Sequence, residues 1–157
     1  MMLRRRFFLG VLFTGILILG LPLSASAENG SLIAGTYWME VAPEGYPSLP
    51  GTLTLNADGV CLASQYLSPF TNNGRGNWQK LGSRGAKGRF LGFNYAPDGT
   101  PTTIVEVTFE GEFDQSCETG EMSFVIGWHA ADQNPLDEEP MYGQNSGFFY
   151  LRRIPAD

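Results

Sequence analysis

The side chains that could carry acid–base, nucleophilic or metal chemistry are few and widely spaced in this sequence. His129 is the single histidine, whereas a zinc site takes three or four His, Cys or carboxylate ligands. Nothing places a nucleophile beside His129, and the sequence contains no nucleophile elbow, P-loop or dinucleotide-binding fingerprint. We therefore predict no catalytic residue, no metal site and no cofactor, and we expect His129 to be an ordinary residue at the end of a strand.

An acidic segment near the C-terminus could attract a cation. It contains Asp132, Gln133, Asn134, Asp137, Glu138 and Glu139. Its spacing differs from that of an EF-hand loop, and the glycine that makes the sharp turn of such a loop is missing. We expect a solvated acidic loop.

The two cysteines, Cys61 and Cys117, have neither a metal-type nor a C-x-x-C spacing. No basic residue adjoins either of them in the sequence, so a reactive thiolate is not expected. In an oxidising compartment an even pair of cysteines most simply forms one disulfide. The sequence therefore predicts a Cys61–Cys117 disulfide.

That compartment is predicted from residues 1–27, which have the form of an export signal. Arg4–Arg6 give a cationic start, Phe7–Leu23 form an apolar run, and Ser24–Ala27 supply the small residues that a signal peptidase reads. We expect cleavage near Ala27 and a single exported domain, residues 28–157, in the periplasm or outside the cell. The uncleaved signal would be its one contact with a membrane, and both the general secretory and the twin-arginine routes fit the Arg-Arg-Phe-Phe-Leu start.

The charge balance excludes some partners. The chain has 10 Lys and Arg against 16 Asp and Glu, a net charge of −6, and loss of the three signal arginines makes it −9. Nucleic acids and anionic membrane surfaces require a basic face. We predict no nucleic-acid partner.

After the signal, apolar residues alternate in short runs that Gly, Pro, Asn and Asp separate, which is typical of antiparallel strands. Asp58-Gly59 and Asp98-Gly99 indicate two tight hairpin turns. The sequence predicts eight strands: Ile33–Val41, Gly51–Asn56, Val60–Leu67, Gly76–Leu81, Gly88–Tyr95, Thr102–Phe113, Glu121–His129 and Gly147–Ile154.

Eight short-linked strands favour an all-β, antiparallel up-and-down barrel, because closure removes exposed sheet edges. A β-sandwich is the alternative fold. In such a barrel alternate connections share an end, which places Cys61 and Cys117 at one pole. The opposite pole is then a mouth formed by the loops Ala42–Pro50, Ser68–Arg75, Ala96–Pro101 and Ala130–Ser146.

Two short motifs resemble the lipocalins and the wider calycin group. Gly35-Thr36-Tyr37-Trp38 is similar to the Gly-x-Trp that opens a lipocalin barrel, with Tyr37 at the Trp position. Tyr150-Leu151-Arg152-Arg153 is similar to the late segment whose Arg packs over that Trp. Gly51–Gly59 followed by Gly76-Asn77-Trp78 resembles small secreted bacterial domains of this kind. The resemblance implies a barrel with an internal pocket for a small apolar ligand, and it implies no catalytic residue.

An eight-stranded barrel is wide enough either to be filled by side chains or to hold one small ligand. We predict a binding protein for a small apolar or amphipathic ligand, whose pocket is lined by Tyr37, Met39, Tyr66, Phe109, Phe124, Trp128 and Tyr150. The first alternative is a protein-binding or inhibitory module that uses its loops on a filled barrel. The second is a cyclase-type enzyme with Ser64, Tyr66 and Asn94 as the polar groups of its interior.

Overall fold

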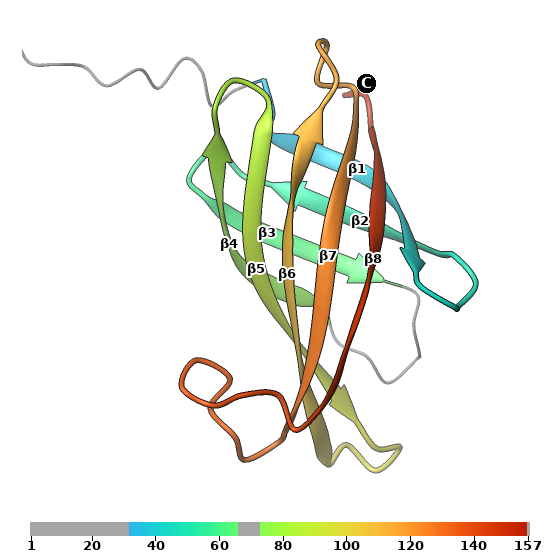
Figure 1. Cartoon of the computed structure of the whole chain (residues 1–157), viewed down its shortest axis with the longest axis vertical. Coiled ribbons are helices and arrows are strands. Elements are labelled where there is room, and N and C mark those ends of the chain that lie inside the picture. Colours follow the sequence, from blue (N-terminus) through green and yellow to red (C-terminus); the bar gives the residue numbers. More distant parts are fainter. Residues whose placement is uncertain (1–31, 66–72, 157) are drawn as a thin grey trace, which may run out of the picture.

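The computed structural model describes residues 32–65 and 73–156. The predicted signal, its cleavage site and Tyr66 lie outside these residues. The predicted fold is confirmed: the chain forms a closed antiparallel barrel of eight strands in which each strand pairs with its sequence neighbours and β1 pairs with β8 (Figure 1). The sandwich alternative is therefore wrong. The strands are β1 (Gly35–Pro43), β2 (Leu49–Leu55), β3 (Val60–Gln65), β4 (Gly74–Leu81), β5 (Gly85–Tyr95), β6 (Pro101–Phe113), β7 (Thr119–Ala130) and β8 (Tyr142–Arg153).

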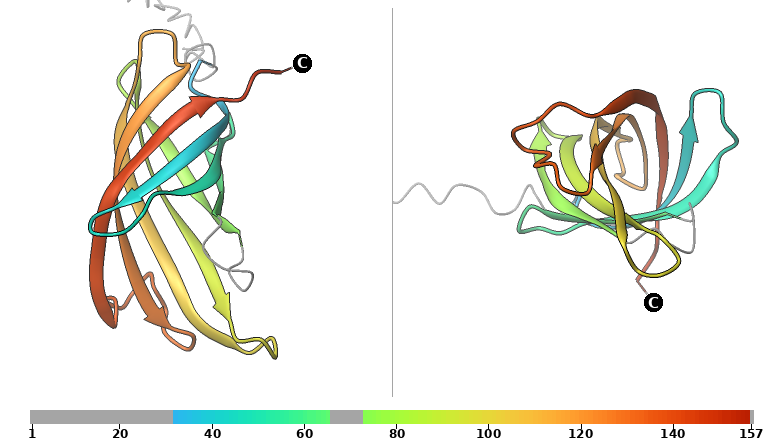
Figure 2. Two further views of the ribbon diagram at one scale, coloured as in Figure 1. Left: turned by 90° about the vertical axis from the view of Figure 1, so that its right-hand side faces the viewer. Right: turned by 90° about the horizontal axis from the view of Figure 1, so that it is seen from below.

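The barrel has two walls of unequal length. The shorter strands β1, β2 and β3 cross behind the long strands β5 to β8, which extend well beyond them toward the β5–β6 and β7–β8 connections (Figures 1 and 2). The turns β2–β3, β4–β5 and β6–β7 share the opposite end, as predicted. No helix within the described ranges is long and apolar enough to cross a membrane.

The two predicted hairpin turns form as their sequences require. Gly59 and Gly99 have φ values of 88° and 85°, a region that glycine enters without steric cost. In each turn the preceding aspartate caps the backbone: Asp58 accepts from the amide of Val60, and Asp98 from that of Thr100. The first turn sets the register of β2 with β3, whereas an irregularity at Asn94/Tyr95 shifts the register of β5 with β6 beyond the second turn.

Side chains fill the barrel interior. Phe124 stacks on Phe149 with ring centroids 4.4 Å apart, and Phe149 contacts Phe109, which in turn contacts Phe90. Gly74 makes room for these rings, because a Cβ there would lie 2.9 Å from Cε2 of Phe90 and closer still to Cδ2. Such contacts are those of a close-packed core.

At the end of the barrel that holds the β6–β7 turn, Arg153 links β8 to β1. Its guanidinium lies over the ring of Tyr37, 4.9 Å from the centroid, and donates to the Tyr37 hydroxyl at 2.7 Å and to the carbonyl of Ala34 at 3.0 Å. The Tyr37 hydroxyl donates to the carbonyl of Ile33 at 2.6 Å. The Arg-over-aromatic packing that the lipocalin resemblance implies is therefore present, with Arg153 rather than Arg152 supplying the cation.

The predicted disulfide is wrong: Cys61 and Cys117 are both buried and unpaired. Both lie at the predicted pole but on different sides of the barrel. Cys61 lies on β3, where its thiol faces the carbonyl of Arg89 on β5 at 3.8 Å. Cys117 lies in the β6–β7 turn, where its own carbonyl accepts from Arg153. Because successive connections lie at alternate ends of the barrel, chain order predicts the end at which a residue lies. It does not predict the position of that residue around the barrel.

Candidate functional site

Four of the seven predicted ligand-binding residues meet in the barrel core. Tyr37, Met39, Phe109 and Phe124 are all buried there. Each packs against other side chains, and burial raises the pKa of Tyr37 to about 12, partly offset by Arg153. Their role in ligand binding stays a prediction.

The other three predicted residues do not join this group. Trp128 is only partly buried, opposite Val105 where the core approaches the predicted mouth. Tyr150 lies on the outer wall between the buried Phe149 and Leu151, with 45% of its surface exposed. Tyr66 lies outside the described residues.

The polar residues considered for an enzyme are not brought together. Ser64 is exposed, and the amide of Asn94 donates to the Thr103 hydroxyl at 2.9 Å across β5 and β6. Within residues 32–65 and 73–156, no three His, Cys, Asp or Glu side chains are grouped so that they could hold a metal ion.

The most unusual polar group is His129, which is not the ordinary strand-end residue that the sequence predicts. It lies on the outer wall, yet none of its surface is exposed. Its Nε2 lies 2.9 Å from Oε2 of Glu106, whose other oxygen lies 2.7 Å from Nε of Arg89. Nδ1 of His129 has no hydrogen-bond partner among the described residues.

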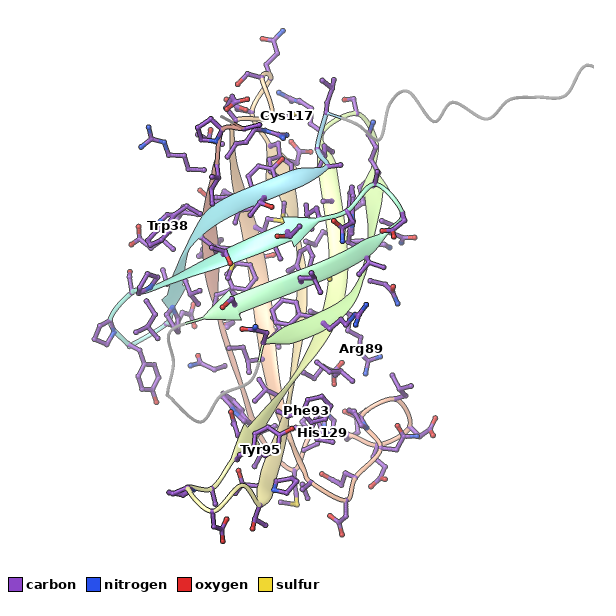
Figure 3. All side chains as sticks on the ribbon, turned by 180° about the vertical axis from the view of Figure 1, so that it is seen from behind. Trp38, Arg89, Phe93, Tyr95, Cys117 and His129 are labelled. Carbon is purple, nitrogen blue, oxygen red and sulfur yellow. The ribbon has the colours of Figure 1, made fainter. Side chains whose placement is uncertain are left out.

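The β7–β8 loop, residues 131–141, covers this trio from outside. Pro140 packs over Gly127, next to His129, where a Cβ would lie 2.7 Å from the proline ring. Arg89 extends across from β5 and donates from Nη2 to the carbonyl of Pro135 at 2.5 Å. Figure 3 shows Arg89 and His129 on the side where this loop folds back. The trio therefore anchors the loop to the barrel wall.

The loop also stabilises itself through its acidic residues. The carboxylate of Glu138 accepts from the amide of Asn134 at 3.0 Å, and Asp137 accepts from the side chain of Asn134 at 2.5 Å. Gln133 accepts from the amide of Ala130 at 2.7 Å. Several of the oxygen atoms that could attract a cation thus accept hydrogen bonds within the loop. Leu136, at the tip of the loop, is 67% exposed.

Two hollows lie on the outer wall beside this loop. The larger, about 530 Å³, runs across β4 to β7 and is lined by Asn77, Trp78, Gln79, Lys87, Gly88, Arg89, Thr108, Phe109, Glu110, Ser123, Phe124 and Val125. The smaller, about 290 Å³, lies under residues 135–140 and shares Arg89, Thr108 and Val125 with the first. Together they form one groove, here called the outer groove, with the loop at its rim.

The outer groove presents both signs of charge. Lys87 and Arg89 come from β5, whereas Glu106 and Glu110 come from β6, and Lys87 stands directly opposite Glu110 in the strand register. Val125 adds an exposed apolar side chain from β7. These groups can form charge-assisted hydrogen bonds with a ligand.

Comparisons of the chain with family models, with curated proteins and with solved structures find no match.

Proposed function

We propose that this protein is a binding module that recognises a protein partner through the outer groove and the anchored β7–β8 loop. One observation carries the proposal: the largest described hollow lies outside the barrel and not inside it. Aromatic side chains occupy the inside of the barrel, whereas the 530 Å³ hollow lies on its outer wall. A filled eight-stranded barrel serves as a rigid scaffold for surface recognition.

The chemistry of the outer groove supports a protein partner. Protein interfaces combine a few apolar anchors with a polar, charged rim. Here Val125 and Leu136 are the exposed apolar groups, and Lys87 and Glu110 are charged groups beside them. The export signal predicted at residues 1–27 supports a partner outside the cytoplasm.

The test is affinity capture from the exported fraction of the source cells on the immobilised protein, followed by binding measurements with the partner that is recovered. Lys87→Glu, Val125→Asp and Leu136→Asp are expected to weaken binding by about tenfold or more each, the size typical of interface anchors. Arg84→Glu, an exposed change in the β4–β5 turn outside the groove, is the matched control. A partner that binds all three groove variants as tightly as the control variant would exclude this surface.

A second candidate function is the binding of a small apolar ligand at the barrel mouth. It is favoured by Val105 and Trp128, a facing pair that is only partly buried at the edge of the core. An apolar fluorescent probe is then expected to bind saturably to the purified protein and to accept energy from tryptophan, with loss of that transfer in Trp128→Phe. Native mass spectrometry of the wild type should show a co-purifying small molecule. Absence of both signals would exclude this function.

A further inference from the structure

A second surface, on the β8 side of the outer groove, carries three exposed aromatic rings. Trp38 on β1 is 52% exposed, and Tyr150 and Phe148 on β8 are 45% and 40% exposed. All three alternate with buried residues, so they share the outer wall of the β1–β8 pair. We call this surface the aromatic strip. Figure 3 shows Trp38 projecting away from the barrel on the side opposite Arg89.

The strand register places the three aromatic residues near one another on the outer wall. Tyr150 stands opposite Glu40, so Trp38, two residues before Glu40, is a diagonal neighbour of Tyr150. Diagonal positions on one sheet face are within reach of aromatic side chains. Phe148 and Tyr150 are separated on β8 only by the inward-facing Phe149. Their ring centroids lie 6.3 Å apart, and the angle between their ring planes is 25°. The ring planes of Phe148 and Tyr150 are therefore nearly parallel, and both rings lie on the same outer face of the sheet as Trp38.

Polar side chains stand beside these rings on the neighbouring strands. Trp38 lies between Thr52 and Arg152, and Tyr150 lies between Glu40 and Glu121. Ser123 stands next to Phe148 on its β7 side. Every ring thus has a hydroxyl, carboxylate or guanidinium group next to it in the sheet.

This pattern fits some partners poorly. Two glutamates beside Tyr150 oppose an anionic membrane or an anionic polymer. None of the three rings lines either outer hollow, so neither hollow lets the strip enclose a small apolar ligand.

We propose that the aromatic strip binds a neutral glycan chain, with the sugar rings lying flat on Trp38, Tyr150 and Phe148. A pyranose ring has an apolar face of C–H groups and a rim of hydroxyls. The faces stack on aromatic rings, whose π-clouds attract the polarised C–H groups. The hydroxyls donate to Glu40 and Glu121 and accept from Arg152, so both halves of the sugar surface meet matching chemistry. This binding surface is independent of the outer groove and of the protein partner proposed for it.

The experiment measures retention of the purified protein on insoluble cellulose, chitin and β-1,3-glucan, and its retardation in gels that contain soluble xylan. Alginate serves as an anionic polymer for comparison. The wild type is expected to bind at least one neutral polysaccharide and not alginate. Trp38→Ala and Tyr150→Ala are expected to weaken that binding by about tenfold each, because exposed aromatic anchors dominate such contacts.

Phe93→Ala is the matched control, since Phe93 is also a 40% exposed aromatic but lies on β5. It is expected to bind as the wild type does, and near-ultraviolet circular dichroism and the melting temperature verify that all three variants fold. Lack of binding to every neutral polysaccharide overturns the proposal. Equal loss in Phe93→Ala also overturns it, as does a molar mass by light scattering that shows wild-type self-association abolished by Trp38→Ala.

Discussion

The substitution Gly74→Ala tests whether the barrel interior is filled. Gly74 is buried at the start of β4, and the nearest atoms to a Cβ at this position all belong to the ring of Phe90. The added carbon would lie 2.9 Å from Cε2 and closer still to Cδ2. Because carbon atoms pack at about 3.5–4.0 Å, the ring must retreat by about 1 Å.

The expected cost follows from what lies behind that ring. Phe90 is 4% exposed, and its ring contacts that of Phe109 at 6.2 Å between centroids. Phe109 in turn contacts Phe149, so the displacement is passed along a row of packed rings. Overpacking of such a core costs about 1–3 kcal/mol in the free energy of unfolding. In a hollow barrel the ring would swing into free space, and the cost would be close to zero.

The assay is urea unfolding followed by tryptophan fluorescence, with the free energy taken from the midpoint and the m-value. The matched control is the same change in a Phe90→Leu background, where the smaller side chain leaves room for the methyl group. There Gly74→Ala is expected to cost at least about 1 kcal/mol less than in the wild type, because residues in contact do not behave additively. The filled-barrel argument would be refuted if Gly74→Ala did not change the free energy of unfolding. It would also be refuted if Gly74→Ala lowered that free energy equally in the wild-type and Phe90→Leu backgrounds.

Three further predictions concern single contacts. Glu106→Gln is expected to lower the free energy of unfolding by about 1–3 kcal/mol, because it weakens the contacts with buried His129 and with Arg89. It should also speed hydrogen exchange in residues 131–141, and unchanged exchange there would disprove the anchoring. Burial raises the pKa of Tyr37 from 10.0 to about 12, so the folded state keeps a proton that the unfolded state has lost, and stability should fall as the pH rises from about 10 to about 12. Tyr37→Phe should lack this component of the decline in parallel urea titrations. Burial also raises the pKa of Cys61 to about 11, and this thiol should resist alkylation at pH 8 until the protein is denatured. Cys117 should resist as well, because it is only 2% exposed, and an intact mass that changes on reduction would indicate a disulfide instead.

Most of the fold could be predicted because it depends on local patterns. Strict alternation on β6, with Val107 and Phe109 inside and Thr108 and Glu110 outside, determines which face is buried. The Asp58-Gly59 turn fixes the register of its hairpin, whereas the shift at Asn94/Tyr95 separates the Asp98-Gly99 turn from the register of β5 with β6. Strand ends differ from the predicted ones by a few residues, because backbone pairing continues past the last alternating apolar residue, as at Thr119–Gly120 on β7.

The Arg89–Glu106–His129 trio could not be predicted from alternation, because it depends on register and on a long loop. In the sheet Arg89 is a diagonal neighbour of Glu106, which is in turn a diagonal neighbour of His129. The Asp98-Gly99 turn does not reveal the first of these pairs, because the shift at Asn94/Tyr95 moves the register by one residue and so exchanges the two faces. No short pattern signals that residues 131–141 fold back and bury His129 completely. The disulfide prediction failed for the same reason, since chain order fixes a pole but not a position around the barrel.

Both surfaces proposed for recognition lie on the outside of this barrel. Eight strands enclose a space just wide enough for side chains, and large rings on the inner face use that space up. In the closed barrel the register aligns the outward residues into rows across neighbouring strands. One such row crosses four strands through Gln79, Lys87, Glu110 and Ser123 and reaches Phe148 on β8. Because these rows lie on the outer wall, their side chains can be changed without any change to the core that holds them.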